Sequence, residues 1–143
     1  MNSGYGAYRA MHVETADKEK LILIVYDVAI KHCRIALEQF GDKTKIMERT
    51  RHVCKAQDAV NELISSLRMD VGEIANKLYS LYDYIVRKMV EANIKNDPSK
   101  IEEVLVYLVD LRGAWSQAII NIRKESLLES TDEPVMENFA ITG

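Results

Sequence analysis

The sequence predicts an all-α protein, an antiparallel up-down four-helix bundle. Apolar residues recur at spacings of three and four along four long segments, and no segment shows the sustained alternation of a half-buried strand. The two prolines, Pro98 and Pro134, lie at predicted boundaries and not inside these segments. The predicted connectors are short, which favours antiparallel neighbours. A chain of 143 residues, 48% of them hydrophobic, suits one domain with a single core.

The ends of the four segments carry local helix signals. Thr15 is a suitable N-cap for the first helix, and Gly41 follows its end. The second helix precedes a break at residues 68–72. Asp97 is suited to cap the fourth helix, with Pro98 at its first position. These signals predict a bundle over residues 1–124, opened by a non-helical cap at 1–14 and followed by a mobile tail at 125–143.

The apolar positions predict which side chains form the core and which remain on the surface. The predicted core includes six residues on the main stripes of the helices: Ile22, Ala29, Leu78, Ile85, Leu108 and Leu111. Ile46 or Met47, together with Ile74, are expected to extend these stripes. The opposite face of the second helix is charged, and Arg49 is expected to lie on it.

Composition and charge exclude several classes of function. The formal net charge is −3 and no basic stripe occurs, so nucleic acid is not an expected ligand. The longest apolar run, residues 21–26, is far shorter than the roughly 20 residues that span a membrane. The N-terminus lacks the layout of a signal peptide, and the two cysteines suggest no disulfide framework. We therefore expect a cytoplasmic protein without membrane insertion.

No motif in the sequence indicates catalysis or a cofactor. There is no nucleophile elbow, phosphate-binding glycine loop, zinc-protease motif or di-iron motif. His32 and His52 would lie at similar heights in a hairpin of the first two helices, close to Cys33 and Cys54. A closed zinc site needs four convergent ligands, whereas neighbouring helical residues point about 100° apart. Buried cysteines and half-exposed histidines explain this group better, so we predict no enzyme, metal or cofactor.

The helices carry more apolar surface than a four-helix core requires. Residues 21–26 cover the whole circumference of the first helix, and the third and fourth helices add apolar residues beside their core stripes. The chain also uses seven tyrosines but only two phenylalanines, a preference typical of interfaces. Such surplus predicts a groove for another polypeptide, or for the chain's own termini. The groove candidates are Leu23, Ile24, Tyr79, Tyr82, Tyr84 and Leu105.

An ordered series of short motifs resembles the FliS family of flagellar secretion chaperones. The match runs from about residue 7 to 119 and rests on Ala7-Tyr8, Val13-Glu14-Thr15-Ala16, Leu21-Ile22, Tyr26-Asp27-Val28-Ala29-Ile30, Gly72-Glu73-Ile74-Ala75, Leu81-Tyr82-Asp83-Tyr84-Ile85, Glu91-Ala92-Asn93 and Leu111-Arg112-Gly113-Ala114-Trp115. Val71 departs from the family, which commonly has a glycine there, so the turn before Gly72 is expected to differ.

The resemblance implies a bundle that binds the C-terminal segment of flagellin in apolar grooves. It implies that the chaperone prevents premature polymerisation and delivers flagellin to the flagellar type III export apparatus. Tyr8 matches a tyrosine thought to cover part of the groove. Tyr26, Asp27, Arg112 and Trp115 belong to the matching motifs and join the predicted partner contacts. Trp115 could instead anchor the core, and Asp27 and Arg112 could be ordinary surface charges.

Other flagellar export or regulatory proteins are further possible partners. The alternative to the chaperone is a regulatory adaptor whose bundle binds another folded protein. Such an adaptor would present a flat interface and have little affinity for a disordered peptide.

Overall fold

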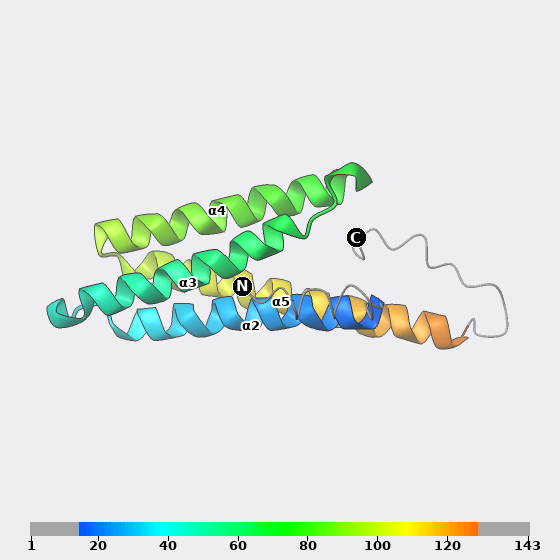
Figure 1. Cartoon of the computed structure of the whole chain (residues 1–143), viewed down its shortest axis with the longest axis horizontal. Helices are drawn as coiled ribbons and strands as arrows, with labels where there is room; N and C mark the ends of the chain where they lie inside the picture. Colours follow the sequence, from blue (N-terminus) through cyan, green and yellow to red (C-terminus); the bar gives the residue numbers. More distant parts are fainter. Residues whose placement is uncertain (1–14, 129–143) are drawn as a thin grey trace, which may run out of the picture.

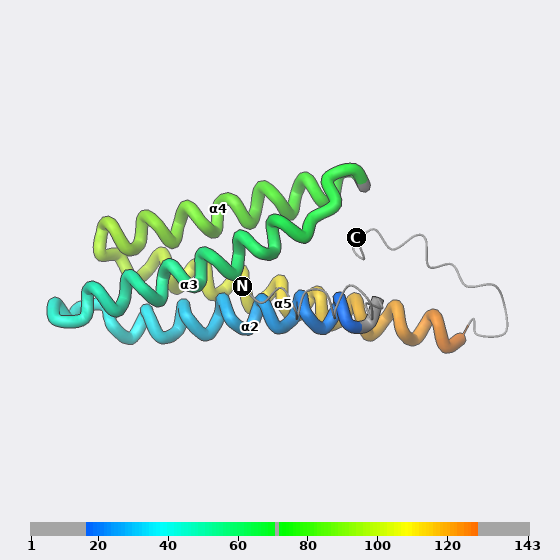
Figure 2. The backbone as a smooth tube through the Cα atoms, viewed as in Figure 1, coloured from blue at the N-terminus to red at the C-terminus, as the bar shows by residue number. Residues whose placement is uncertain are grey.

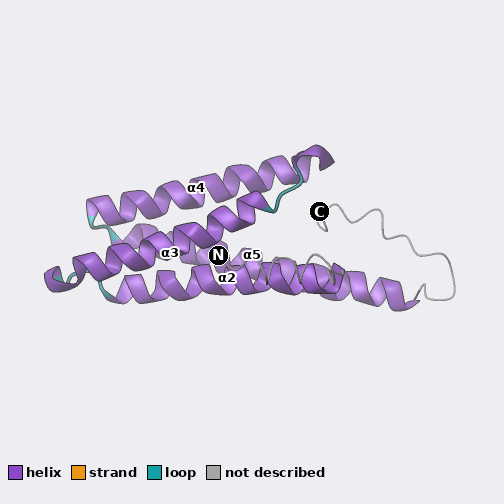
Figure 3. Ribbon diagram, in the orientation of Figure 1, coloured by secondary structure: helices purple, strands orange, loops and turns teal. Residues whose placement is uncertain are grey.

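The computed structural model describes residues 15–128, and four α-helices dominate this part of the chain (Figure 1). They are α2 (Thr15–Glu38), α3 (Ile46–Ser65), α4 (Glu73–Lys95) and α5 (Pro98–Leu128). Two short 3-10 helices, η1 (Lys43–Lys45) and η2 (Met69–Val71), precede α3 and α4. Figure 3 shows only helices and loops in the described residues. The predicted cap with Tyr8, and residues 129–143 of the predicted tail, lie outside them.

The helices form an up-down bundle in which consecutive helices run in opposite directions (Figure 2). α2 packs mainly against α3 and α5, and α4 packs mainly against the same two helices. α2 and α4 therefore lie across the bundle from each other. The prediction of an all-α, antiparallel four-helix bundle is confirmed.

The turns follow from residues that tolerate unusual backbone angles. Gly41 and Gly72 have φ angles of +90° and +100°, which residues with a side chain rarely adopt. Asn96 ends α4 in the left-handed conformation, and the Asp97 carboxylate accepts a hydrogen bond from the Ser99 N–H at 3.0 Å. α5 then begins at Pro98 as predicted. It continues to Leu128, so the first four residues of the predicted tail are helical.

The core joins residues from all four helices. Its largest fully buried side chains are Tyr26, Tyr82, Leu63, Ile85, Met89, Ile101 and Leu108. Of the six predicted core residues, Ala29, Ile85 and Leu108 are buried, whereas Ile22, Leu78 and Leu111 are partly buried and pack against the core.

Three predicted core residues are instead exposed: Ile46, Met47 and Ile74. Met47 is 86% exposed because the buried stripe of α3 passes through positions 49, 52, 53 and 56, on the opposite side of the helix. Ile46 and Ile74 lie in the first turns of α3 and α4. There the buried stripe of each helix has only begun, with Arg49 and Ala75 as its first buried residues.

Arg49 does not lie on a charged surface as predicted, because it is only 4% exposed. Its Nε donates to Asn93 Oδ1 at 3.0 Å and its Nη1 to Asn96 Oδ1 at 2.8 Å. Nη2 donates to the Asn93 carbonyl at 3.2 Å, and the guanidinium carbon lies 4.3 Å from the centre of the Phe40 ring. The forked guanidinium thus replaces its water shell with fixed partners and ties α3 to the C-terminal end of α4.

Candidate partner-binding surfaces

Two of the predicted partner contacts, Tyr26 and Tyr82, lie in the core. Their hydroxyl oxygens are 2.5 Å apart and their rings 6.4 Å apart, which links α2 to α4 across the bundle. Burial raises the pKa of both phenols, whereas hydrogen bonding to Trp115 acts to lower the pKa of each. Because both side chains are enclosed by the four helices, neither forms a groove surface while the bundle is closed.

The predicted contacts on α5 are partly accessible to solvent. Trp115 and Leu105 are partly buried and pack against the core. Arg112 pairs with the exposed Asp27 of α2, with its Nε 2.6 Å from Oδ1 and its Nη2 3.3 Å from Oδ2. This contact raises the pKa of the Arg112 guanidinium. The two-pronged pair links α2 to α5 and leaves both side chains within reach of a partner.

Tyr84, another predicted contact, is exposed and belongs to a cluster between α4 and α5 whose other members, Glu103 and Tyr107, are partly buried. Its hydroxyl donates to Glu103 at 2.6 Å, and the Tyr107 hydroxyl donates to the same carboxylate oxygen at 3.2 Å. The two rings meet edge to face with centres 6.1 Å apart. Hydrogen bonding to Glu103 raises the pKa of Tyr84 to about 12 and lowers the pKa of Glu103. Lys88 lies over the Tyr84 ring at 5.4 Å.

Three exposed apolar side chains follow helical spacing along α5. Val106, Val109 and Ile120, which we call the α5 stripe, are 58%, 42% and 44% exposed. Their intervals of three and eleven residues keep them on one face of the helix. Gly113 lies between them, and a Cβ placed there would meet no atom within 4 Å. A glycine in a helix interior costs about 1 kcal/mol relative to alanine, but it lets another chain approach closely.

A second set of exposed apolar residues follows α4. Tyr79, Val90 and Ile94 form the α4 stripe, with intervals of eleven and four residues. Tyr79 was among the predicted contacts. On α2, the predicted contact Ile24 is exposed together with Val28, four residues further on, whereas Leu23 is only partly exposed. Three predicted contacts are therefore exposed. Ile24 lies on α2, whereas Tyr79 and Tyr84 lie on different faces of α4.

Sequence reasoning missed most of the two stripes, namely Val90, Ile94, Val106, Val109 and Ile120. The signal was present in the spacing of these residues, which repeats on a helical face beside the core stripe. Because surface positions often carry isolated apolar residues, this spacing alone did not separate a binding stripe from ordinary exposure.

Metal-binding clusters, cysteine reactivity and membrane-spanning helices can each be checked in the described residues. No group of three or more His, Cys, Asp or Glu side chains within residues 15–128 is arranged to hold a metal ion. Burial raises the pKa of the Cys33 thiol to about 12, which keeps this cysteine protonated and inert. None of the helices in this part of the chain has both the length and the apolarity of a transmembrane span.

Comparisons with known proteins identify the family of this chain. Residues 1–122 match the family described as "Flagellar protein FliS". The chain is similar to the flagellar secretion chaperone FliS of Bacillus subtilis, with 35% identity over 121 residues that cover 85% of this chain and 90% of the relative. It is also similar to the FliS chaperones of Salmonella typhimurium (36% over 124 residues; 80% and 89% covered) and Vibrio cholerae (30% over 125 residues; 82% and 89% covered). The chain therefore belongs to the FliS family of flagellar secretion chaperones.

Proposed function

We propose that this chain is a cytoplasmic export chaperone that binds the C-terminal segment of flagellin. It prevents premature polymerisation of flagellin and delivers it to the flagellar type III export apparatus. The chain acts by binding, without catalysis and without a cofactor. Membership of the family of flagellar secretion chaperones supports the general role, and the surface of the bundle supports the mode of binding.

The observation that carries this proposal is the α5 stripe. Its apolar side chains are not needed to fill the core, since other positions of α5, such as Ile101, Val104 and Leu108, are fully buried and do so. An apolar face of this kind is left to bind a segment with its own apolar residues at helical spacing. The open space above Gly113 would admit the backbone of that segment.

A disordered partner can contact an extended surface more completely than a folded partner can. The α4 stripe and the α5 stripe lie on different helices, so a partner that contacts both must extend over more than one helix. A chain that orders on binding can do so, and the apolar area that it buries offsets the entropy that it loses. The role of Tyr8 as a cap over this surface stays a prediction, as do the contacts of Leu23, Ile24, Tyr79, Tyr84, Leu105, Asp27, Arg112 and Trp115 with flagellin.

The test is a calorimetric titration of the full chain with a peptide from the C-terminal end of flagellin of the same organism. We expect 1:1 binding at micromolar or tighter affinity with a negative heat-capacity change, because apolar surface is buried. Val109→Asp should weaken binding at least tenfold. The matched control is Ala114→Asp, which places the same charge at an exposed position of α5 about 140° away around the helix.

Equal loss of affinity in both variants would remove the α5 stripe from the binding site. No binding to the folded wild-type bundle would contradict the flagellin proposal itself. A regulatory adaptor for a folded protein would then be the better account. Competition by other flagellar proteins for the same surface is tested by adding them to the same titration.

A further inference from the structure

A histidine pair bridges α2 and α3 and has no part in the proposed binding surfaces. The Nδ1 atoms of His32 and His52 are 2.9 Å apart, and the rings stack with centres 5.1 Å apart at an angle of 27°. His52 is only 8% exposed, and His32 is partly buried. The pair lies between neighbouring helices, so its protonation state bears directly on their packing.

The distance between the two nitrogens limits the number of protons that the pair can hold. A hydrogen bond between them needs one Nδ1 as donor and the other as acceptor. A neutral pair satisfies this requirement, and so does a pair with one additional proton. With two additional protons both Nδ1 atoms become donors that face each other at 2.9 Å, and the two rings are positively charged with their centres 5.1 Å apart. The second proton is therefore incompatible with the closed contact.

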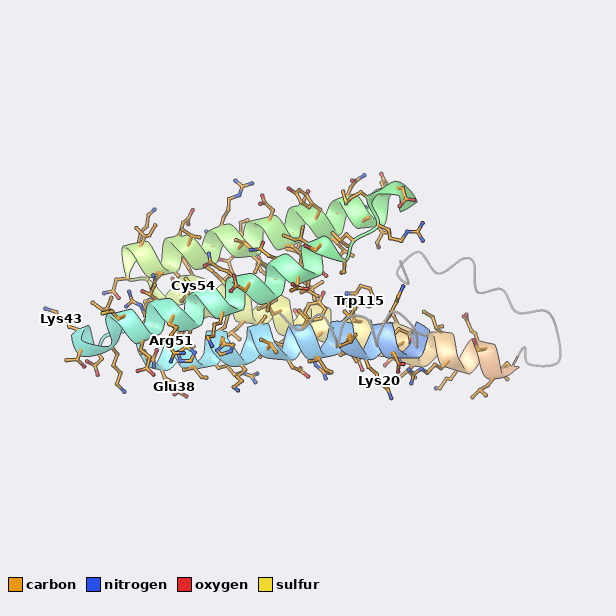
Figure 4. All side chains as sticks on the ribbon, viewed as in Figure 1. Lys20, Glu38, Lys43, Arg51, Cys54 and Trp115 are labelled. Carbon is orange, nitrogen blue, oxygen red and sulfur yellow. The ribbon has the colours of Figure 1, made fainter. Side chains whose placement is uncertain are left out.

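The surroundings add to this resistance. The other charged groups that act on His32 are all cationic, namely Lys31 of α2 and Arg51 and Lys55 of α3. Arg51 projects from α3 on the side of α2 (Figure 4) and pairs with Glu48 at 3.7 Å. Burial, the neighbouring His52 and these cations all lower the pKa of His32. The same cations also disfavour a metal ion at the pair, so its chemistry is with protons.

We propose that the His32–His52 pair is an acid-sensitive latch: the closed α2–α3 contact holds at most one extra proton, so acidification loosens α2 from α3 at this level. The α4–α5 contact, which lies on the other side of the bundle, has no such pair. Acid therefore acts first on one half of the molecule. This inference does not depend on the identity of the export substrate.

The direction of the effect follows from linkage. The closed pair binds protons more weakly than the unfolded chain, whose histidines titrate near pH 6.5. The stabilisation is therefore complete above about pH 6.5 and declines as the pH falls through that value. If unfolding is accompanied by the binding of one additional proton, the unfolding constant rises about tenfold for each unit by which the pH falls below about 6.5.

The experiment is urea unfolding of the full chain at several pH values between about 7.5 and 5. As the pH falls, the wild-type unfolding constant should rise more steeply than that of His32→Gln, by about tenfold per unit of pH, because the variant has no second imidazole facing His52 across the contact. The slope is decisive, because loss of the hydrogen bond also changes the stability at neutral pH. His12→Gln removes a histidine outside the pair and should keep the wild-type slope. Equal slopes for wild type and His32→Gln would overturn the latch.

A second measurement needs no variant. Nuclear magnetic resonance titration of the wild-type protein should show a pKa of the His32 ring below its usual range, because burial, the facing imidazole and the nearby cations oppose its protonation. Amide hydrogen exchange, corrected for its intrinsic pH dependence, should increase in α2 and α3 before it increases in α4 and α5. A His32 pKa in the usual range, or uniform exchange over all four helices, would contradict the proposal.

Discussion

Two tyrosine pairs of this bundle have opposite environments. Tyr26 and Tyr82 are fully buried and bond to each other through their hydroxyls at 2.5 Å. Tyr84 and Tyr107 lie between α4 and α5, near the surface, where their hydroxyls share the Glu103 carboxylate. Tyr82 and Tyr84 are only two residues apart, yet about 200° of helical rotation separates them.

The difference shows that tyrosine content alone does not identify a binding surface. A buried phenol needs a partner for its hydroxyl, and in the core that partner is a second tyrosine. An exposed phenol can use a carboxylate and still present one edge of its ring to solvent. The core pair therefore contributes to stability, whereas the surface pair is available for recognition. The predictions below test this division, starting with the largest expected effect.

Removal of a core tyrosine should have the largest effect. Tyr82→Ala should destabilise the bundle by about 3–5 kcal/mol, the range for deletion of a large buried aromatic ring. Tyr84→Ala, the same substitution two residues away, should leave the midpoint of urea unfolding almost unchanged. Comparable losses from the two variants would show that the division between core and surface is wrong.

Removal of one core hydroxyl should have a smaller effect. Tyr26→Phe removes the hydroxyl that lies 2.5 Å from the buried Tyr82 hydroxyl, which should cost about 1–3 kcal/mol. The double variant Tyr26→Phe, Tyr82→Phe should lose less than the sum of the two single variants, because both unpaired groups are gone. Strict additivity in chemical denaturation would mean that the two hydroxyls do not depend on each other.

A substitution at the surface pair should change the pKa of Tyr84 and leave the free energy of unfolding almost unchanged. The Glu103 carboxylate accepts the Tyr84 hydroxyl bond and raises the pKa of Tyr84 to about 12. Glu103→Gln removes the negative charge that favours the protonated phenol, so the pKa of Tyr84 should fall toward its ordinary value near 10. Ultraviolet or nuclear magnetic resonance titration of the folded protein measures this shift. An unchanged pKa would show that Glu103 does not hold the pair.

Much of the fold could be predicted from the sequence because its signals are local. Glycines, Asp97 and Pro98 determine where helices end and begin, and the apolar spacing places Ala29, Ile85 and Leu108 inside. The position of Arg49 could not be predicted in this way. Its burial depends on Phe40, Asn93 and Asn96, which belong to other parts of the chain and come close only in the folded bundle.

The candidate surface was harder to predict than the fold. Tyr79, Tyr84 and Ile24 are exposed as a groove residue must be, but Tyr26 and Tyr82 are in the core. The sequence showed that apolar residues exceeded the needs of the core. It did not show which of them would face the two neighbouring helices, since that depends on how each helix is rotated in the bundle. The α5 stripe became visible only once this rotation was known.

The most direct test of the account is methyl nuclear magnetic resonance of valine and isoleucine side chains during addition of the flagellin C-terminal segment. We expect large shifts for the methyl groups of Val106, Val109 and Ile120. We expect small shifts for core valines of α3 such as Val53 and Val60, because the bundle and its buried tyrosine pair stay closed. Shifts confined to other faces, or spread through the core, would contradict binding at the exposed stripes.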